Sequence, residues 1–260
     1  MRIYILADME GISGIRWMPQ VKRDSGEFDQ GRRLMMADIN AAVDGAMLGG
    51  ASEVVVCDTH AGGGQVRMEE MDERAVYEMP TADDMMPSLD ESFAGVVLLG
   101  HHARAGTLNG FLDHTMNSGE WFEYRINEQV VGEIGIEAAY AGHYGVPIIA
   151  ISGDQATAEE ARELLGDSLP CAVVKWGLGR NKAKCLPVTR AREIVRDTIR
   201  QAVEQAHRCQ PFCPELPATI ELTLYRSDYA DALAARPNTQ RVDARRIRRT
   251  VRSLADIRGW

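Results

Sequence analysis

The chain has 260 residues, of which 45% are hydrophobic and 26% are charged, and its formal net charge is −9. This length allows one large domain or two modest ones with a sizeable buried core, and the ordinary composition excludes a disordered or fibrous protein. The acidic balance disfavours a surface that follows the phosphates of a nucleic acid.

The first sixty residues predict a β-strand, an α-helix and a second β-strand in that order. Residues 3–7 are a short apolar run, and residues 31–48 carry apolar side chains at helical spacing up to Gly49 and Gly50, which are typical of a helix end. Residues 53–57 contain three consecutive β-branched valines and are too continuously apolar to have a solvated face. We therefore expect a parallel, buried pair of strands joined by a helix.

Two later segments repeat the pattern of an apolar run that ends in polar residues. Residues 95–100 and 146–151 favour two more strands, so that four core strands share one open sheet. Between them, residues 124–126 and 129–131 predict a small hairpin that leads into a helix over residues 132–143. The fold class expected from these elements is α/β, with an open, mainly parallel sheet flanked by helices.

The remainder of the chain predicts a smaller α+β domain. The expected elements are helices over residues 157–165 and 189–207, strands over residues 172–175 and 219–224, and a further strand near residues 240–242. We therefore place an α/β domain at residues 1–154 and a smaller C-terminal domain, contributing to oligomer contacts, at residues 155–260.

Arginines are concentrated in the last thirty residues, against the acidic balance of the whole chain. They are Arg236, Arg241, Arg245, Arg246, Arg248, Arg249, Arg252 and Arg258. We predict a helix over residues 243–257 whose arginines are solvated or pair with acidic neighbours, including those of another subunit. No nucleic-acid partner is expected.

Cysteine usage and hydropathy point to a cytoplasmic protein. The five cysteines are odd in number and widely spread, which is not typical of a disulfide framework. No apolar stretch approaches the roughly 20 residues of a membrane-crossing helix, and the first residues begin a strand without the pattern of a signal peptide. We expect no membrane partner.

Side chains that bind metal ions follow three of the predicted strands. They are Asp8 and Glu10 after the first strand, Asp58 and His60 after the second, and His101 and His102 after the third. Singly, each has an ordinary interpretation as a turn former, a helix cap or a packed histidine. Because the carboxyl ends of parallel strands converge, their joint placement predicts a site for zinc or another first-row divalent ion.

The same residues resemble a known family, in order and across nearly the whole chain. The matching motifs are Ala7-Asp8-Met9-Glu10-Gly11-Ile12-Ser13-Gly14, Asp58-Thr59-His60, Gly100-His101-His102-Ala103-Arg104-Ala105, His114-Thr115-Met116, Val131-Gly132-Glu133-Ile134-Gly135, Val173 with Lys175, and Lys184-Cys185-Leu186. Together they resemble the bacterial D-aminopeptidases of the dipeptide-transport type, a family of dizinc peptidases. The resemblance implies that Asp8 bridges two zinc ions per subunit, that Glu10 and Glu133 complete one site, and that His60 and His102 complete the other.

The resemblance also implies the activity and the assembly. It makes His114 the catalytic residue, and D-Ala-containing di- and tripeptides the substrates. It further implies a homodecamer of two stacked pentameric rings with the active sites facing an inner chamber. The residues 1–154 then form the catalytic domain.

The functional interpretation of three residues depends on the resemblance. Glu133 by itself is an ordinary carboxylate in the first turn of a helix. His101 and Asp58 match no ligand position, so we expect His101 to lie behind the ligands and Asp58 to orient His60 or the backbone of its loop.

The expected reaction is hydrolysis of the first peptide bond of a short peptide by metal-activated water. His114 acts in this hypothesis as general acid and base, in preference to a nucleophile, because an imidazole titrates near neutral pH. A dinuclear phosphoesterase is an alternative, although Arg104 is the one cationic side chain beside the ligands. A non-catalytic ring-forming protein that keeps the metal for assembly is another, but such a protein does not need His114. An L-selective peptidase would carry the same ligands.

Overall fold

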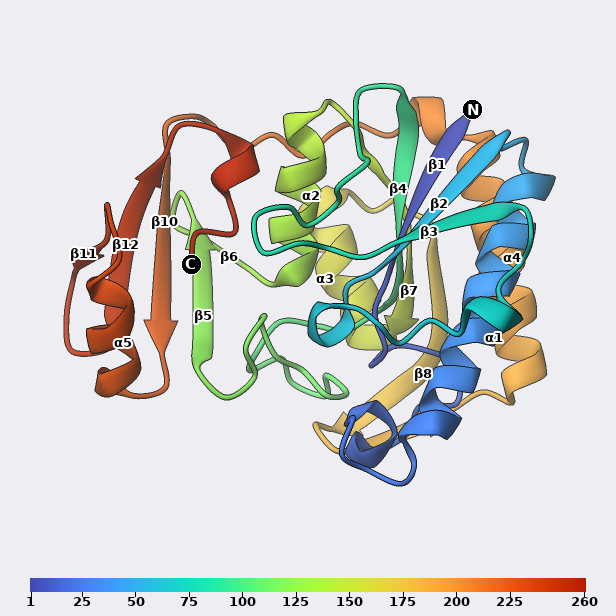
Figure 1. The fold of residues 1–260 in the computed structure, drawn as a ribbon, viewed down its shortest axis with the longest axis horizontal. Coiled ribbons are helices and arrows are strands. Elements are labelled where there is room, and N and C mark those ends of the chain that lie inside the picture. The colour runs from blue at the N-terminus through green and yellow to red at the C-terminus, as the bar shows by residue number, and fades with distance from the viewer.

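A seven-stranded sheet forms the larger part of the molecule, in the order β3-β2-β1-β4-β7-β8-β9 (Figure 1). The computed structural model describes residues 1–260. The strands are β1 (Arg2–Ala7), β2 (Glu53–Asp58), β3 (Ala75–Glu78), β4 (Phe93–His101), β7 (Ile148–Asp154), β8 (Cys171–Gly179) and β9 (Lys182–Cys185). All neighbouring pairs are parallel except β8 and β9. The four strands expected from the sequence therefore share one open sheet, and the α/β fold class is confirmed.

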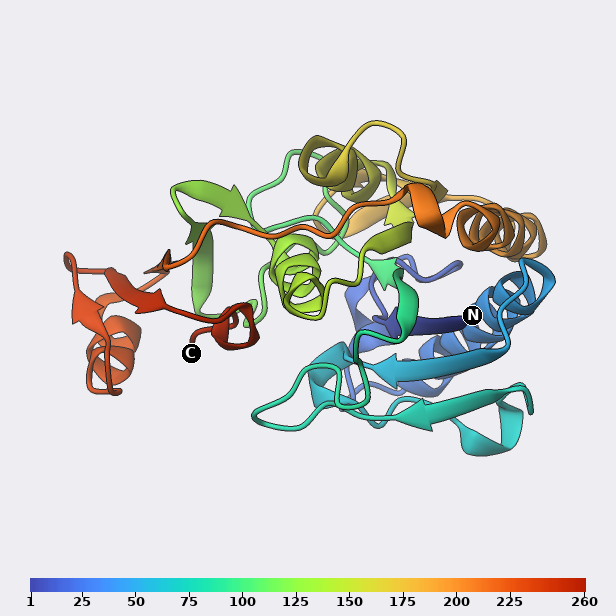
Figure 2. The same cartoon turned by 90° about the horizontal axis from the view of Figure 1, so that it is seen from above.

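Helices cover both faces of this sheet (Figures 1 and 2). One face carries α1 (Phe28–Leu48) and α4 (Val188–Glu204), and the other carries α2 (Glu133–His143) and α3 (Gln155–Leu165). Alternate residues of β1 accordingly enter separate cores, with Ile3 on the α1 side and Tyr4 on the α2 side. Burial on both faces explains why these strands are apolar without alternation. None of the helices combines the length and apolarity needed to span a membrane.

A second, antiparallel sheet lies beyond α2 and has the order β11-β12-β10-β5-β6 (Figure 1). Its elements are β5 (Trp121–Ile126), β6 (Gln129–Val131), β10 (Ala218–Leu224), β11 (Gln240–Arg241) and β12 (Arg246–Val251), together with α5 (Ser227–Ala234). The hairpin of β5 and β6 and the helix that follows it agree with the sequence prediction. Residues of this sheet share one apolar core with α2, so α2 joins the two sheets.

The division of the chain between the two sheets does not follow the predicted domain boundary after residue 154. The elements α3, β8, β9 and α4 follow that boundary but belong to the layers of the large sheet, whereas β5 and β6 precede it and belong to the small sheet. The physical reason is long-range pairing, because β10 binds the free edge of β5. The small sheet is thus built from two distant segments.

The helix predicted over residues 243–257 is wrong, because β12 occupies residues 246–251. In β12, Ile247 and Val251 are buried. Arg248 lies opposite Glu221 of β10 and forms an ion pair with it. A cross-strand pair of opposite charges stabilises a sheet, so these arginines support a strand in place of a helix.

Candidate metal centre

The loop after β1 lies directly on the end of β4. The backbone N–H of Asp8 donates to Leu99 at 2.8 Å, and that of Gly11 donates to Gly100 at 2.7 Å. This approach requires glycine twice: Gly100 has φ of +71°, and a Cβ on Gly11 would collide with the carbonyl oxygen of His101. Backbone contacts alone therefore hold the ends of these two strands together, without any contribution from side chains that could bind a metal.

One group of side chains that could hold a metal ion contains Asp8, Glu10 and His60. Nδ1 of His60 lies 3.0 Å from Oδ1 of Asp8 and 3.1 Å from Oε2 of Glu10. All of the ligand atoms in this group lie within 4.8 Å of one another. The ends of β1 and β2 thus converge as the sequence predicted.

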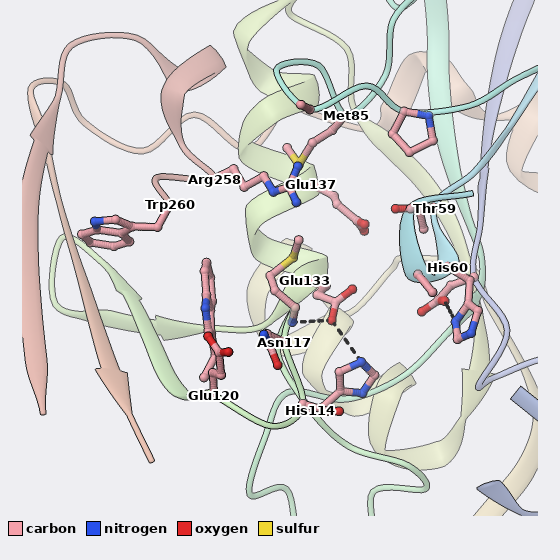
Figure 3. Close-up of a pocket in the computed structure, with 18 of the residues that line it drawn as sticks. Thr59, His60, Met85, His114, Asn117, Glu120, Glu133, Glu137, Arg258 and Trp260 are labelled. Carbon is pink, nitrogen blue, oxygen red and sulfur yellow. Dashed lines mark hydrogen bonds and ion pairs between the residues drawn. The ribbon is translucent and has the colours of Figure 1, made fainter. Parts of the chain in front are cut away.

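A second group contains His102, His114 and Glu133, and Figure 3 shows His114 and Glu133 together in the cavity. Nε2 of His102 lies 3.3 Å from Oε1 of Glu133 and 3.4 Å from Oδ2 of Asp8. Nε2 of His114 lies 3.7 Å from the same oxygen of Glu133, and the two imidazole rings stack with centroids 3.9 Å apart. Asp8 therefore turns one oxygen toward each group, through Oδ1 and Oδ2.

All five expected ligands and His114 meet in one place, but their grouping differs from the one that the resemblance implies. Glu10 lies with His60, and Glu133 lies with His102. The resemblance joined Glu10 with Glu133 and His60 with His102. Asp8 lies between the two groups in both arrangements.

Each of the three histidines presents one ring nitrogen to a backbone carbonyl and the other to carboxylates. The carbonyl contacts are His60 Nε2 to Val21 at 3.0 Å, His102 Nδ1 to Ala103 at 3.0 Å and His114 Nδ1 to Leu112 at 2.9 Å. Histidines that bind metals are commonly oriented in this way. Nε2 of His102 is moreover buried and has no hydrogen-bond partner. A ring nitrogen that lies beside carboxylates and has no hydrogen-bond partner is suited to bind a zinc ion.

The electrostatics of the centre also fit a cation. Burial by itself would lower the pKa of His60, but the nearby Glu10 and Asp8 carboxylates raise it well above its usual value. Burial would raise the pKa of Glu10, and His60 instead brings it well below its usual value. His102 and Glu133 affect each other in the same way, because the charge of each outweighs the effect of burial on the other. The pKa of His102 is therefore raised well above its usual value, and that of Glu133 is lowered to about 2. Three buried carboxylates therefore need positive charge, which protonated imidazoles or a bound cation supply.

His101 lies behind the ligands, as expected from its position in the resemblance. Its Nε2 is 2.7 Å from Oε2 of Glu137, and both side chains are buried. Glu137 also lines the cavity, which the sequence reasoning missed. Its spacing of four residues from Glu133 was the available signal, since residues at i and i+4 share one face of a helix.

Asp58 orients the loop backbone and not the ring of His60. Its Oδ2 accepts hydrogen bonds from the backbone N–H groups of Gln65 at 2.5 Å and Val66 at 3.3 Å. The side-chain amide of Gln65 donates in turn to the carbonyl oxygen of His60. Asp58 thus supports His60 through the backbone of the loop.

A buried lysine, Lys175 of β8, fixes the loop that carries Glu10. Its Nζ donates to the carbonyl oxygens of Glu10 at 2.8 Å, Ile12 at 2.7 Å and Ile15 at 2.7 Å. Burial lowers the pKa of Lys175 to about 8. This role was not predicted, although a lysine inside an apolar strand is a visible signal in the sequence.

Lys175→Met is expected to destabilise the protein and to weaken its metal binding. Three buried carbonyl oxygens would lose a charged donor, and each such bond contributes about 1.5–3 kcal/mol. Urea unfolding of the metal-free protein should show a loss of at least about 2 kcal/mol. The exposed Lys184→Met serves as the control, and equal stability of the two variants would contradict the assigned role.

A cavity of about 680 Å³ opens over the metal-binding side chains. The loop after β2 contributes His60, α2 contributes Glu133 and Glu137, and β5 contributes Trp121. The end of the chain contributes Arg258, on the side of the cavity opposite to His60 (Figure 3). The cavity therefore lies between the two sheets, and its volume falls within the usual range for small-ligand sites.

Comparison with known proteins agrees with this geometry. The family model described as D-aminopeptidase matches residues 1–260. A D-aminopeptidase of Bacillus subtilis (strain 168) is 32% identical over 236 residues, which cover 89% of this chain and 84% of the relative. The solved structure of the zinc-dependent D-aminopeptidase DppA from Bacillus subtilis, described as a self-compartmentalizing protease, superposes with a TM-score of 0.94 at 27% identity, and covers 99% of this chain and 94% of that one. With its full-length match and its cluster of buried carboxylates and histidines, the chain belongs to the D-aminopeptidase family and is a metallo-aminopeptidase.

Proposed function

We propose that this protein is a dizinc D-aminopeptidase that removes the N-terminal residue, D-Ala foremost, from short peptides. The observation that carries the proposal is the position of Asp8, whose two oxygens face two separate groups of donors. The zinc dependence of the superposed Bacillus subtilis enzyme supports the choice of metal.

The residues proposed to hold the two zinc ions are Asp8, Glu10, His60, His102 and Glu133. Their mixture of carboxylate oxygens and imidazole nitrogens is a donor set that zinc accepts. When bound there, zinc would polarise the scissile carbonyl group and make water a stronger nucleophile near neutral pH. The backbone contacts of the histidines and the anchoring by Lys175 hold these donors in place before substrate enters.

We propose that His114 transfers a proton to the leaving amine. The contact of its Nδ1 with the carbonyl of Leu112 directs Nε2 toward Glu133 and the cavity. An imidazole held in this orientation can take a proton from water and deliver it to the amine nitrogen as the peptide bond breaks. The alternative is attack by His114 itself as a nucleophile.

The proposed assembly is a homo-oligomer, and specifically a decamer with its active sites facing an inner chamber. The description of the superposed enzyme as self-compartmentalizing supports an assembly of this kind. The measurement is the mass in solution, which for a decamer is ten times the 28.7 kDa of one chain.

Metal removal and stereochemistry together test the proposed function. Purified protein is expected to contain two zinc ions per chain and to release alanine from D-Ala-D-Ala much faster than from L-Ala-L-Ala. Treatment with a chelator should abolish release, and added zinc should restore it, because the donors bind a metal that the reaction needs.

Three other outcomes would contradict the proposal in distinct ways. Equal or faster release from L-Ala-L-Ala would make the protein an L-selective peptidase. Hydrolysis of p-nitrophenyl phosphate without release of alanine would indicate a phosphoesterase. A zinc-dependent change of mass with neither reaction would indicate a ring-forming protein that uses the metal for assembly.

A further inference from the structure

Some of the arginines near the end of the chain form ion pairs, and Arg258 is among those that do not. Arg241 pairs with Asp231, and Arg248 pairs with Glu221. Arg258 has no carboxylate oxygen within the 4.0 Å of an ion pair, although it lines the same cavity as the metal-binding residues. An unpaired guanidinium in a substrate cavity is available to a ligand.

The backbone on both sides of Arg258 is held firmly. The hydroxyl group of Tyr124 donates to the carbonyl oxygen of Ile257, and the guanidinium of Arg249 donates to that of Gly259. Gly259 has φ of +81°, and a Cβ there would lie 2.7 Å from Cδ1 of Ile220. Chain ends are usually mobile unless they are held by such contacts. The position of Arg258 is therefore built into the small sheet.

The side chain of Arg258 projects from this anchored segment into the cavity (Figure 3). Its Nε is buried and has no hydrogen-bond partner. Arg236, an exposed residue that also has no ion-pair partner, lines the same cavity and adds positive charge. The acidic side chains that line the cavity are Asp8, Glu120, Glu133 and Glu137, and none of them forms an ion pair with Arg258.

The cavity thus has carboxylates clustered with histidines on one side, and Arg236 and Arg258 together with Glu120 on the other. The carboxylates beside the histidines lie on one side, and the half-buried, unpaired guanidinium of Arg258 lies on the side of the small sheet. A short peptide with free ends has a reactive N-terminal peptide bond near one end and a carboxylate at the other. Guanidinium groups bind carboxylates through two parallel, charge-assisted hydrogen bonds.

We propose that Arg258 binds the C-terminal carboxylate of the peptide substrate and so selects short peptides with a free carboxyl end. This inference rests on the proposed peptidase function. A longer peptide would present an uncharged peptide group at Arg258 and leave the guanidinium without its anion. Arg258 is thus a specificity residue, separate from the groups that perform hydrolysis.

The test compares D-Ala-D-Ala with its C-terminal amide, D-Ala-D-Ala-NH2, on the full-length zinc-loaded protein. The wild-type protein should prefer the free acid in kcat/KM by roughly 10- to 100-fold, as expected for hydrogen bonds to a charged group. Arg258→Met should remove this preference, chiefly by raising KM for the acid, while hydrolysis of the amide changes little. Arg258→Lys should restore part of the preference because it keeps the charge but loses the paired geometry.

The matched control is Arg252→Met, which removes an exposed arginine that does not line the cavity. Zinc content and melting temperature of each variant show whether it is folded. An acid preference that persists in a folded Arg258→Met variant would overturn the inference and leave the peptidase function intact. Failure of the wild-type protein to hydrolyse either peptide would overturn the proposed function, and this inference with it.

Discussion

Asp8→Asn is expected to release both zinc ions and to reduce peptide hydrolysis by at least about 10³-fold, at the upper end of what one polar group contributes to catalysis. The side chain of Asp8 is buried between the two donor groups, with Oδ1 3.0 Å from His60 and Oδ2 3.4 Å from His102. The amide of asparagine has no negative charge and offers one oxygen in place of two. Metal analysis after dialysis, together with the D-Ala-D-Ala assay, measures both effects.

The matched variant for this prediction is Glu10→Gln. Glu10 contacts His60 and belongs to one donor group alone. We therefore expect Glu10→Gln to weaken one zinc site and to leave the other occupied. If Asp8→Asn retained one full equivalent of zinc, Asp8 would belong to a single site and the bridging role would be wrong.

His114→Ala is expected to lower kcat by roughly 10²–10⁴-fold, the usual contribution of a general acid or base. Both zinc ions should remain bound. The measurement combines kcat for D-Ala-D-Ala with the zinc content of the same preparation. His207→Ala is the control, because His207 is exposed and outside the cavity.

The zinc content decides between the possible roles of His114. Its ring stacks on His102, and its Nε2 faces the same oxygen of Glu133, so the geometry also suits a metal ligand. Loss of zinc from His114→Ala would identify it as a ligand. A covalent adduct on His114 during turnover, detected by mass spectrometry of the quenched enzyme, would favour the nucleophile over proton transfer.

The convergence of the candidate metal-binding side chains was largely predictable because it depends on a general property of parallel sheets. The side chains after β1, β2 and β4 converge once these strands are neighbours, and apolar runs are sufficient to predict the strands. Glu133 was different: its place in the first turn of a helix is ordinary, and the family resemblance alone pointed to it. Only the packing of α2 against the large sheet brings its carboxylate to 3.3 Å from His102.

The differences between the sequence prediction and the structure come from pairing over long distances in the chain. The apolar residues of the arginine-rich segment near the C-terminus have no clear period, so the pattern does not distinguish a solvated helix from a strand. The strand forms because β10 offers Glu221 opposite Arg248 and buries Ile247. The predicted division after residue 154 does not match the two sheets for a similar reason, because β5 pairs with β10, which follows about a hundred residues later in the chain.

Local sequence features are enough to predict the apolar strands, the carboxylates and histidines at their ends, and hence a candidate metal centre at one edge of a parallel sheet. These features are local, since each depends on residues a few positions apart. What surrounds this candidate centre depends on how distant segments pack together. Lys175 and Arg258 reach the site through contacts between segments distant in the chain, and such contacts depend on packing that no local pattern specifies.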